Sequence, residues 1–270
     1  SMNVLAGVQT SQGIRGSPSP SPQIWEQSID FMQDTPEGSV TLSWWDYGYL
    51  FQTLGRTGSV ADGGNFGYYA DGEKINYPLA DCLTSTNTSN HEEFLNKHSV
   101  DYIVLDSSMI GKYSAVSQIH NRNNSEFNLM RNFGAQDQTQ RENDTLVTYS
   151  SRIGNLFVPY SLENASAEIN SAPTLETRRG RTDIDCVLTE NGRKTFNTSR
   201  ESDYCVADHP FRAYPGARGS SQTVLVPEEI ADSTLVRLYI MDGYGIDYAE
   251  KIPEASNGYV KMWKVQDRDE

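Results

Sequence analysis

The residues best suited to chemistry in this chain form a short run at positions 44–49, with the sequence Trp-Trp-Asp-Tyr-Gly-Tyr. Trp44 and Trp45 are adjacent, and adjacent side chains on an extended segment point to opposite faces. One indole can therefore anchor in a core while the other lines a pocket, where Asp46 adds a hydrogen-bond acceptor. Gly48 lets the backbone turn sharply after this unit. The set suits recognition of a small hydroxyl group, and a buried aromatic corner capped by the aspartate is the alternative.

A second group of candidate residues follows a buried strand that we predict over residues 101–105. Asp106 or Ser107 can cap the helix that begins after this strand. Met109 and Lys112 are three residues apart and share a face of that helix, so both can edge one pocket. The alternative is that Met109 is a core residue and Lys112 is solvated.

The elements around both groups indicate a mixed α+β fold. Apolar residues recur at helical spacing after Ser21-Pro22, a good helix start, and residues 35–38 end this helix. The other predicted elements are a strand at 39–43, a short helix at 49–54, a polar loop at 55–67, a helix at 92–97 and the helix after residue 106. This order predicts an α/β core over residues 21–138, preceded by a flexible Ser/Gly/Pro-rich lead-in at 1–20.

The pattern changes near residue 139, where short β-type runs replace the helical spacing. These runs lie at 146–149, 156–160, 186–189, 194–196 and 223–226, and Asn191-Gly192 between two of them predicts a type I′ hairpin. We therefore predict an inserted all-β module over residues 139–228. Residues 229–270 return to the core through a helix at 235–241 and an alternating strand at 259–265.

Composition restricts the classes of partner. The chain has 270 residues and a net charge of −14, which argues against a nucleic-acid partner. No apolar stretch approaches the roughly 20 residues that span a bilayer. Arg outnumbers Lys by 15 to 7, and an acidic, Lys-poor composition is typical of proteins from salty environments, with an ordinary acidic protein as the alternative.

The cysteines and sequons bear on location. Cys82, Cys186 and Cys205 permit at most one disulfide; Cys186 and Cys205 are nearest in sequence, although spacing alone does not establish their pairing. Five Asn-x-Ser/Thr sequons, at Asn87, Asn123, Asn143, Asn164 and Asn197, modestly favour a location outside the cytoplasm.

Other candidate sites are weak. The chain has no CxxC motif and no Cys/His cluster, so a structural zinc site is not indicated. Residues 183–185, Asp-Ile-Asp, imitate a glycosyltransferase Asp-x-Asp, but their place in the β module predicts a solvated strand or turn. The four histidines show no ligand spacing and are predicted to be surface or packing residues.

Residues 44–49 closely resemble the signature of the catalytic subunit of oligosaccharyltransferases, called Stt3 in eukaryotes and AglB in archaea. Further similar segments are residues 35–37, Arg56, 59–62, 234–239 and 242–245. In that family the Trp-Trp-Asp unit binds the hydroxyl of the Ser or Thr two residues after the acceptor asparagine. The resemblance therefore implies that the acceptor-binding residues include Trp44, Trp45, Asp46, Tyr47 and Gly48.

The family also has a second motif, Asp-x-x-Lys followed by an apolar residue one turn later. This chain has Asp106, but Met109 stands at the Lys position and Lys112 follows three residues later, which resembles an archaeal variation. The resemblance implies that these residues complete the acceptor site, with Met109 against a threonine methyl group and Lys112 supplying charge or a hydrogen bond. A pocket that hydrogen-bonds a hydroxyl rejects alanine strongly, whereas a methyl contact gives a small preference.

The resemblance implies partners that this chain does not hold by itself. In the family, the residues that hold a divalent metal (Mn or Mg) and position a dolichol-phosphate-type lipid-linked oligosaccharide lie in a membrane-embedded part. We therefore expect a sequon-recognising domain at the extracellular face of the cell membrane, from an archaeal, salt-adapted enzyme, without transferase activity of its own. A carbohydrate-binding module with exposed, coplanar indoles and a surface-layer structural domain with a buried, inert Trp-Trp-Asp unit are the alternatives.

Overall fold

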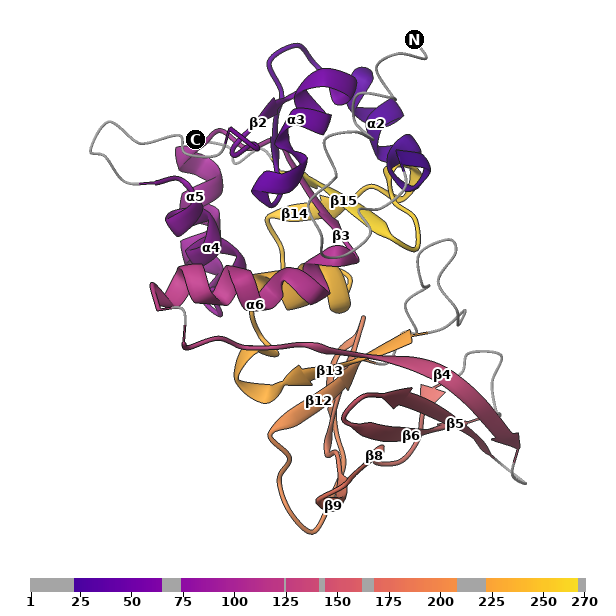
Figure 1. Cartoon of the computed structure of the whole chain (residues 1–270). Coiled ribbons are helices and arrows are strands. Elements are labelled where there is room, and N and C mark those ends of the chain that lie inside the picture. Colours follow the sequence, from indigo (N-terminus) through magenta and orange to yellow (C-terminus); the bar gives the residue numbers. More distant parts are fainter. Residues whose placement is uncertain are drawn as a thin grey trace.

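The computed structural model describes residues 22–64, 74–123, 125–140, 144–161, 168–207 and 222–266, and these residues form two β-sheets (Figure 1). Helices cover a five-stranded mixed sheet, and a larger sheet forms the lower part of the molecule in the view of Figure 1. The predicted mixed α+β fold is therefore confirmed. The predicted lead-in at residues 1–20 lies outside the described residues. Among the helices of the described part, none combines the length and the hydropathy needed to cross a membrane.

The five-stranded sheet contains both parallel and antiparallel pairs. Its order is β14 (Ala249–Lys251), β15 (Val260–Val265), β3 (Tyr102–Asp106), β1 (Val40–Leu42) and β2 (Gly58–Ser59). β1 runs parallel to β2 and β3, whereas β15 is antiparallel to β3 and β14. Three of these strands, β1, β3 and β15, correspond to the strands predicted at 39–43, 101–105 and 259–265.

Most of the helices precede or follow these strands. In chain order the helical elements are η1 (Pro22–Trp25), α2 (Glu26–Gln33), η2 (Trp45–Tyr47), α3 (Gly48–Leu50), the π-turn η3 (Phe51–Gly55), α4 (Asn76–Thr84), α5 (Thr88–Lys97), α6 (Ser108–Asn121), η4 (Glu228–Ile230), the π-turn η5 (Val236–Ile240) and η6 (Pro253–Ala255). α5 begins before its predicted start at 92 because the Asn87 side chain accepts a hydrogen bond from the Ser89 N–H and caps the helix. α4 is not predicted, since its nine residues offer only a short apolar periodicity.

β3 is buried along its whole length because the sheet has an apolar cluster on each face. Tyr102 and Val104 belong to the cluster that contains Trp25 of the first helical segment. Ile103 and Leu105 belong to the other cluster, which contains side chains of α4, α5 and α6. Successive strand residues point to opposite faces, so a sheet covered on both sides requires a continuous apolar strand.

The larger sheet is the all-β module. Its order is β11 (Gly192–Thr195), β10 (Cys186–Thr189), β12 (Tyr204–Ala207), β13 (Gln222–Pro227), β4 (Arg131–Gln140), β5 (Asp144–Ser151), β6 (Gly154–Ser161), β8 (Thr174–Thr177) and β9 (Gly180–Asp183), with β7 (Glu168–Ile169) beside β6. β4 begins at Arg131, ahead of the predicted module start at residue 139. The sequence of β4 is largely polar, so it lacks the apolar alternation that marks a strand.

The hairpin formed by β10 and β11 has a different turn from the predicted one. Thr189 pairs with Gly192, so the two loop residues are Glu190 and Asn191. A type I′ turn needs a positive φ at both loop residues. In this hairpin only Gly192 has a positive φ, of 112°, and the type I′ prediction is therefore wrong.

Cys186 and Cys205 form a disulfide between the neighbouring strands β10 and β12, with their Cα atoms 4.5 Å apart. Cys82 is buried and free. Both disulfide cysteines belong to the same apolar cluster as Ile110 and Tyr113 of α6. The module therefore packs against α6, as the arrangement in Figure 1 shows.

Candidate functional site

The two motif segments meet because they leave the same edge of the five-stranded sheet. β1 and β3 are parallel neighbours, with Leu42 opposite Ile103. The chain therefore continues from adjacent points into the Trp44–Gly48 segment and into α6. The carboxyl ends of parallel strands are a common place for binding sites in α/β sheets.

Trp44 and Trp45 lie in different surroundings. Trp44 is extended (φ −65°, ψ 145°), only 2% exposed, and belongs to the apolar cluster beneath α6. Trp45 begins the 3₁₀ turn η2 and is partly buried against the same cluster. Because Trp44 is buried, the two indoles do not form the exposed platform that a carbohydrate-binding module would need.

Gly48 serves close packing rather than a sharp turn. Its backbone is ordinary right-handed helix (φ −54°, ψ −45°), which any residue can adopt. A Cβ at this position would lie 2.2 Å from the carbonyl oxygen of Ala61 and 2.4 Å from the Cα of Asp62. The prediction of a turn that requires glycine is therefore wrong. The missing side chain instead lets the motif pack directly on the segment after β2.

Asp46 and Lys112 form an accessible ion pair at this edge. The Lys112 Nζ lies 2.5 Å from the Asp46 Oδ2, and the two side chains are 27% (Lys112) and 25% (Asp46) exposed. The same Nζ donates to the Tyr47 hydroxyl at 3.0 Å and lies 4.4 Å from the centre of the Tyr47 ring. An ammonium group has three N–H donors, and these two contacts use two of them. A donor with spare capacity therefore stands beside a carboxylate acceptor.

Tyr47 is held in place by the opposite apolar cluster. Its ring is almost completely buried, with its centre 4.6 Å from that of Trp25 and 6.4 Å from that of Phe51. The ring is thus fixed by packing, and its hydroxyl reaches the polar edge where Lys112 lies.

A chain of hydrogen bonds leads from Lys112 to Asp106. The Tyr47 hydroxyl lies 2.8 Å from the Ser108 Oγ, and Ser108 donates its hydroxyl and its backbone N–H to the Asp106 carboxylate at 2.9 and 3.0 Å. Ser108 has a single hydroxyl proton, so its oxygen accepts from Tyr47, and the Tyr47 oxygen accepts from Lys112. All donors in this series of hydrogen bonds therefore point toward Asp106, and such bonds polarise one another.

Ser108 is absent from the predicted site residues, although the sequence carries a signal for it. A Ser two residues after an Asp at a strand–helix junction fits the local side-chain to backbone bonding that Asp commonly makes. Here the Asp106 carboxylate accepts the Ser108 N–H and secures the start of α6.

Asp106 and Met109 lie behind the site, since both are 0% exposed. Met109 belongs to the apolar cluster that contains Trp44. Positions three apart on an α-helix differ in direction by about 60°, which is enough for one side chain to point inward and the other to reach an edge. The expectation that Met109 and Lys112 border one pocket is therefore wrong, because Met109 is buried. The alternative that Lys112 is merely solvated is also wrong, because Lys112 forms an ion pair with Asp46.

The described residues do not indicate a metal site. Among them, no group of three or more His, Cys, Asp or Glu side chains is arranged to hold a metal ion, so they give no ligand set for Mn²⁺ or Mg²⁺. In the Asp-Ile-Asp segment, Asp183 accepts from Thr174 and Asp185 accepts from the Ser202 N–H, which are structural contacts.

His91 is a packing residue. It is 0% exposed, its ring centre lies 5.2 Å from that of Tyr248, and burial lowers its pKa to about 3. Neither ring nitrogen has a hydrogen-bond partner among the described residues. His91 is therefore neutral at physiological pH.

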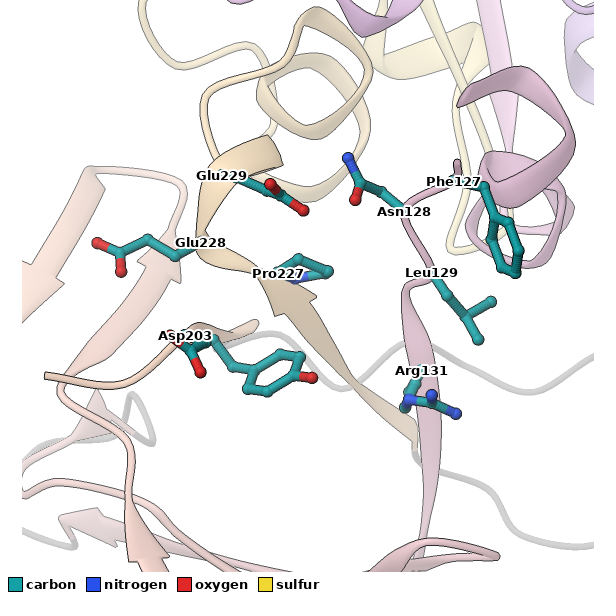
Figure 2. Close-up of a pocket in the computed structure, with 9 residues that line it drawn as sticks. Phe127, Asn128, Leu129, Arg131, Asp203, Pro227, Glu228 and Glu229 are labelled. Carbon is teal, nitrogen blue, oxygen red and sulfur yellow. The ribbon is translucent and has the colours of Figure 1, made fainter. Parts of the chain in front are cut away.

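A cleft of about 730 Å³ lies elsewhere, between the start of β4, the end of β13 and η4 (Figure 2). Figure 2 shows Leu129 and Arg131 on the segment that leads into β4, with Pro227 at the end of β13 and Glu229 in η4 on the neighbouring segment. Its described lining residues include none from the motif segments. The cleft combines both signs of charge with a few apolar groups, which indicates no particular ligand chemistry.

One family model matches part of the chain. Residues 37–159 match the model of the STT3/PglB/AglB core domain. Over these residues the chain is similar to the core domain of STT3, PglB and AglB. The matched segment includes β1, β3, α6 and both motifs, and the resemblance of residues 44–49 is confirmed at the level of the family.

Solved structures of this family resemble the chain. The C-terminal domain of PglB from C. jejuni has a TM-score of 0.53 and 10% identity, covering 89% of this chain and 98% of that domain, which shows a shared fold. An Archaeoglobus fulgidus oligosaccharyltransferase tethered to an acceptor peptide containing the NVT sequon has a TM-score of 0.43 and 16% identity, covering 92% of this chain. Archaeoglobus fulgidus AglB in complex with an inhibitory peptide and a dolichol-phosphate has a TM-score of 0.44 and 13% identity, covering 93% of this chain.

These two archaeal enzymes are longer than the chain, which covers 25% and 28% of them. A sequence search among curated proteins found no match.

Proposed function

We propose that this chain is the acceptor-recognising domain of a membrane oligosaccharyltransferase. It binds the sequon Asn-x-Ser/Thr while another part of the enzyme transfers a lipid-linked oligosaccharide to the asparagine. The observation that carries the proposal is the partly exposed Asp46–Lys112 pair at the edge where the two family motifs meet.

The chemistry of this pair fits a hydroxyl group. A serine or threonine hydroxyl both accepts and donates a hydrogen bond. The spare N–H of Lys112 donates a hydrogen bond to the hydroxyl oxygen, and the hydroxyl group donates a hydrogen bond to the Asp46 carboxylate. Trp45 provides an apolar wall. An alanine at this position of the acceptor leaves both groups desolvated and unpaired, which supports strong discrimination.

Threonine gains little over serine in this arrangement. Met109 has no exposed surface, so it does not touch an acceptor methyl. A methyl contact would in any case contribute less than about 1 kcal/mol.

Two further components of the enzyme are proposed because of the family resemblance. They are a divalent cation, Mn²⁺ or Mg²⁺, bound outside this chain, and a dolichol-phosphate-type donor. The domain then lies at the extracellular face of the membrane. The acidic composition fits a salt-rich archaeal source, since salt screens the repulsion of a −14 net charge.

The test is photo-crosslinking of a tethered sequon peptide to the chain. We expect a Thr peptide to label the chain more strongly than an otherwise identical Ala peptide. Asp46→Asn and Lys112→Met should each reduce labelling by about 10- to 100-fold, because each leaves a charged partner unpaired. Lys264→Met, at an exposed lysine on β15, is the matched control and should leave labelling unchanged. Equal labelling by the Thr and Ala peptides would sink the proposal.

A further inference from the structure

The chain's own sequons differ in how far their side chains are engaged in the fold. Three of the five, at Asn87, Asn123 and Asn197, lie in described parts of the chain, whereas Asn143 and Asn164 lie outside them. An acceptor sequon must present its asparagine amide and the hydroxyl two residues later to an enzyme at the same time. The structure shows which of the three can do so.

Two of the three sequons are already used by local structure. Asn87 caps α5 by accepting the Ser89 N–H, so the residue two positions later is inside the first helical turn. Asn123 accepts both the N–H and the hydroxyl of Ser125, which occupies the hydroxyl that an acceptor site must bind. Either sequon would need local unfolding before it could bind.

Asn197 lies in an exposed loop between β11 and β12. Asn197 and Ser199, the first and third sequon residues, are both exposed. Neither side chain has a hydrogen bond to any described residue, and residues 197–201 belong to no described helix or strand. The middle residue, Thr198, instead donates its hydroxyl to the Arg200 carbonyl within the loop.

Both ends of this loop are tied to one residue of the sheet. The Phe196 N–H donates to the Asp185 carbonyl at 2.8 Å, and the Ser202 N–H donates to the Asp185 side chain at 3.1 Å. The Cys186–Cys205 disulfide encloses the whole segment. The loop is thus presented as a short protrusion that can change conformation without loss of the flanking strands.

The disulfide also indicates the compartment. Disulfides persist in oxidising environments, which lie on the side of the membrane where the proposed function places this domain.

We propose that Asn197 is itself an N-glycosylation site, modified by the enzyme of which this domain is part. The inference rests on the proposed function. The Asn197 Nδ2 forms a bond to the anomeric carbon of a lipid-phosphate-linked oligosaccharide. The bond between that carbon and the phosphate oxygen breaks, the lipid phosphate leaves, and the amide loses one proton.

The experiment is mass spectrometry of the full-length protein purified from its own host. Trypsin cleaves after Lys194 and Arg200 and releases the peptide 195–200, which contains the whole sequon. We expect most copies of this peptide to carry a glycan. Ser199→Ala should lower the glycosylated fraction by about tenfold or more, because it removes the hydroxyl that the acceptor site binds, whereas Ser199→Thr should retain it. Thr198→Ala is the matched control, since it removes the loop's internal bond but keeps the sequon, and it should remain glycosylated.

A reporter separates this inference from the proposed function. The same cells, with and without this enzyme, express an unrelated exported protein with one exposed Asn-x-Thr sequon. An unmodified 195–200 peptide beside a glycosylated reporter overturns the assignment of Asn197 and leaves the proposed function intact. If neither is glycosylated, both fail. A glycan that survives Ser199→Ala also overturns the inference.

Discussion

The edge of the five-stranded sheet and the β module are held together in different ways. At the edge, Tyr47 and Lys112 meet across 65 positions of sequence through a few polar contacts. In the module, most paired strands are neighbours in the chain, and a disulfide spans only 19 positions. The edge therefore depends on the global arrangement of parallel strands, whereas the module depends largely on local pairing. Substitutions in each region test this contrast.

Removal of the disulfide should have the largest effect on stability and little effect on recognition. With Cys186→Ala and Cys205→Ala together, we expect the free energy of unfolding in urea to fall by about 3 kcal/mol, since the bond constrains a short loop in the unfolded chain. Labelling by a sequon peptide should persist in the folded fraction, because the Asp46–Lys112 pair joins η2 to α6 and involves neither of the strands that the disulfide links. A reducing agent should reproduce the shift in the unmodified protein only. Loss of labelling in the folded variant would show that the two regions are coupled.

Gly48→Ala should disturb the edge through packing. The new Cβ would overlap the Ala61 carbonyl, so we expect about 2 kcal/mol of destabilisation, together with weaker peptide labelling as Asp46 is displaced. Gly111→Ala is the control, because no atom lies within 4 Å of its Cβ position apart from its chain neighbours and the backbone of α6 itself. That substitution should stabilise the protein by about 0.5–1 kcal/mol. Equal effects of the two substitutions would contradict the packing role of Gly48.

His91 should make stability depend on pH. Its pKa is about 3 in the folded protein and 6.5 when unperturbed, so the unfolded chain takes up a proton that the folded chain excludes. This contribution to stability is complete above pH 6.5 and is lost as pH falls toward 3. The loss amounts to about 2 kcal/mol at pH 5. In urea unfolding between pH 7 and pH 5, His91→Leu should lose less stability than the unmodified protein. An equal loss of stability in the two proteins would contradict this role of His91.

Ser108→Ala should have the smallest effect and act through Lys112. It interrupts the chain of hydrogen bonds between Tyr47 and Asp106, at a cost of about 1 kcal/mol in stability. Peptide labelling should weaken by about 3- to 10-fold, because Lys112 is less firmly oriented. A double-mutant cycle with Tyr47→Phe should show non-additive effects on labelling. Fully additive effects would mean that Ser108 acts independently of Tyr47.

Much of the local structure was open to prediction from sequence. The strands β1, β3 and β15 and the helix α6 have apolar patterns that depend only on neighbouring residues, and each forms close to its predicted place. The motif at 44–49 is specific enough to indicate the family from its residue types and their order alone. The polar strand β4 and the short helix α4 lacked such patterns, and their formation depends on the elements they contact.

The composition of the site was decided by tertiary structure. Sequence placed Asp46 and Lys112 in two separate candidate groups, and only the parallel pairing of β1 with β3 brings them within 2.5 Å. The same packing makes Met109 a core residue, buries Asp106 behind Ser108, and makes Gly48 necessary because the Ala61 carbonyl lies against it. These roles depend on atoms far away in the chain, so no local pattern contains them. The sequence by itself determined which residue types are available, and the fold decided which of them are accessible beyond the carboxyl ends of β1 and β3.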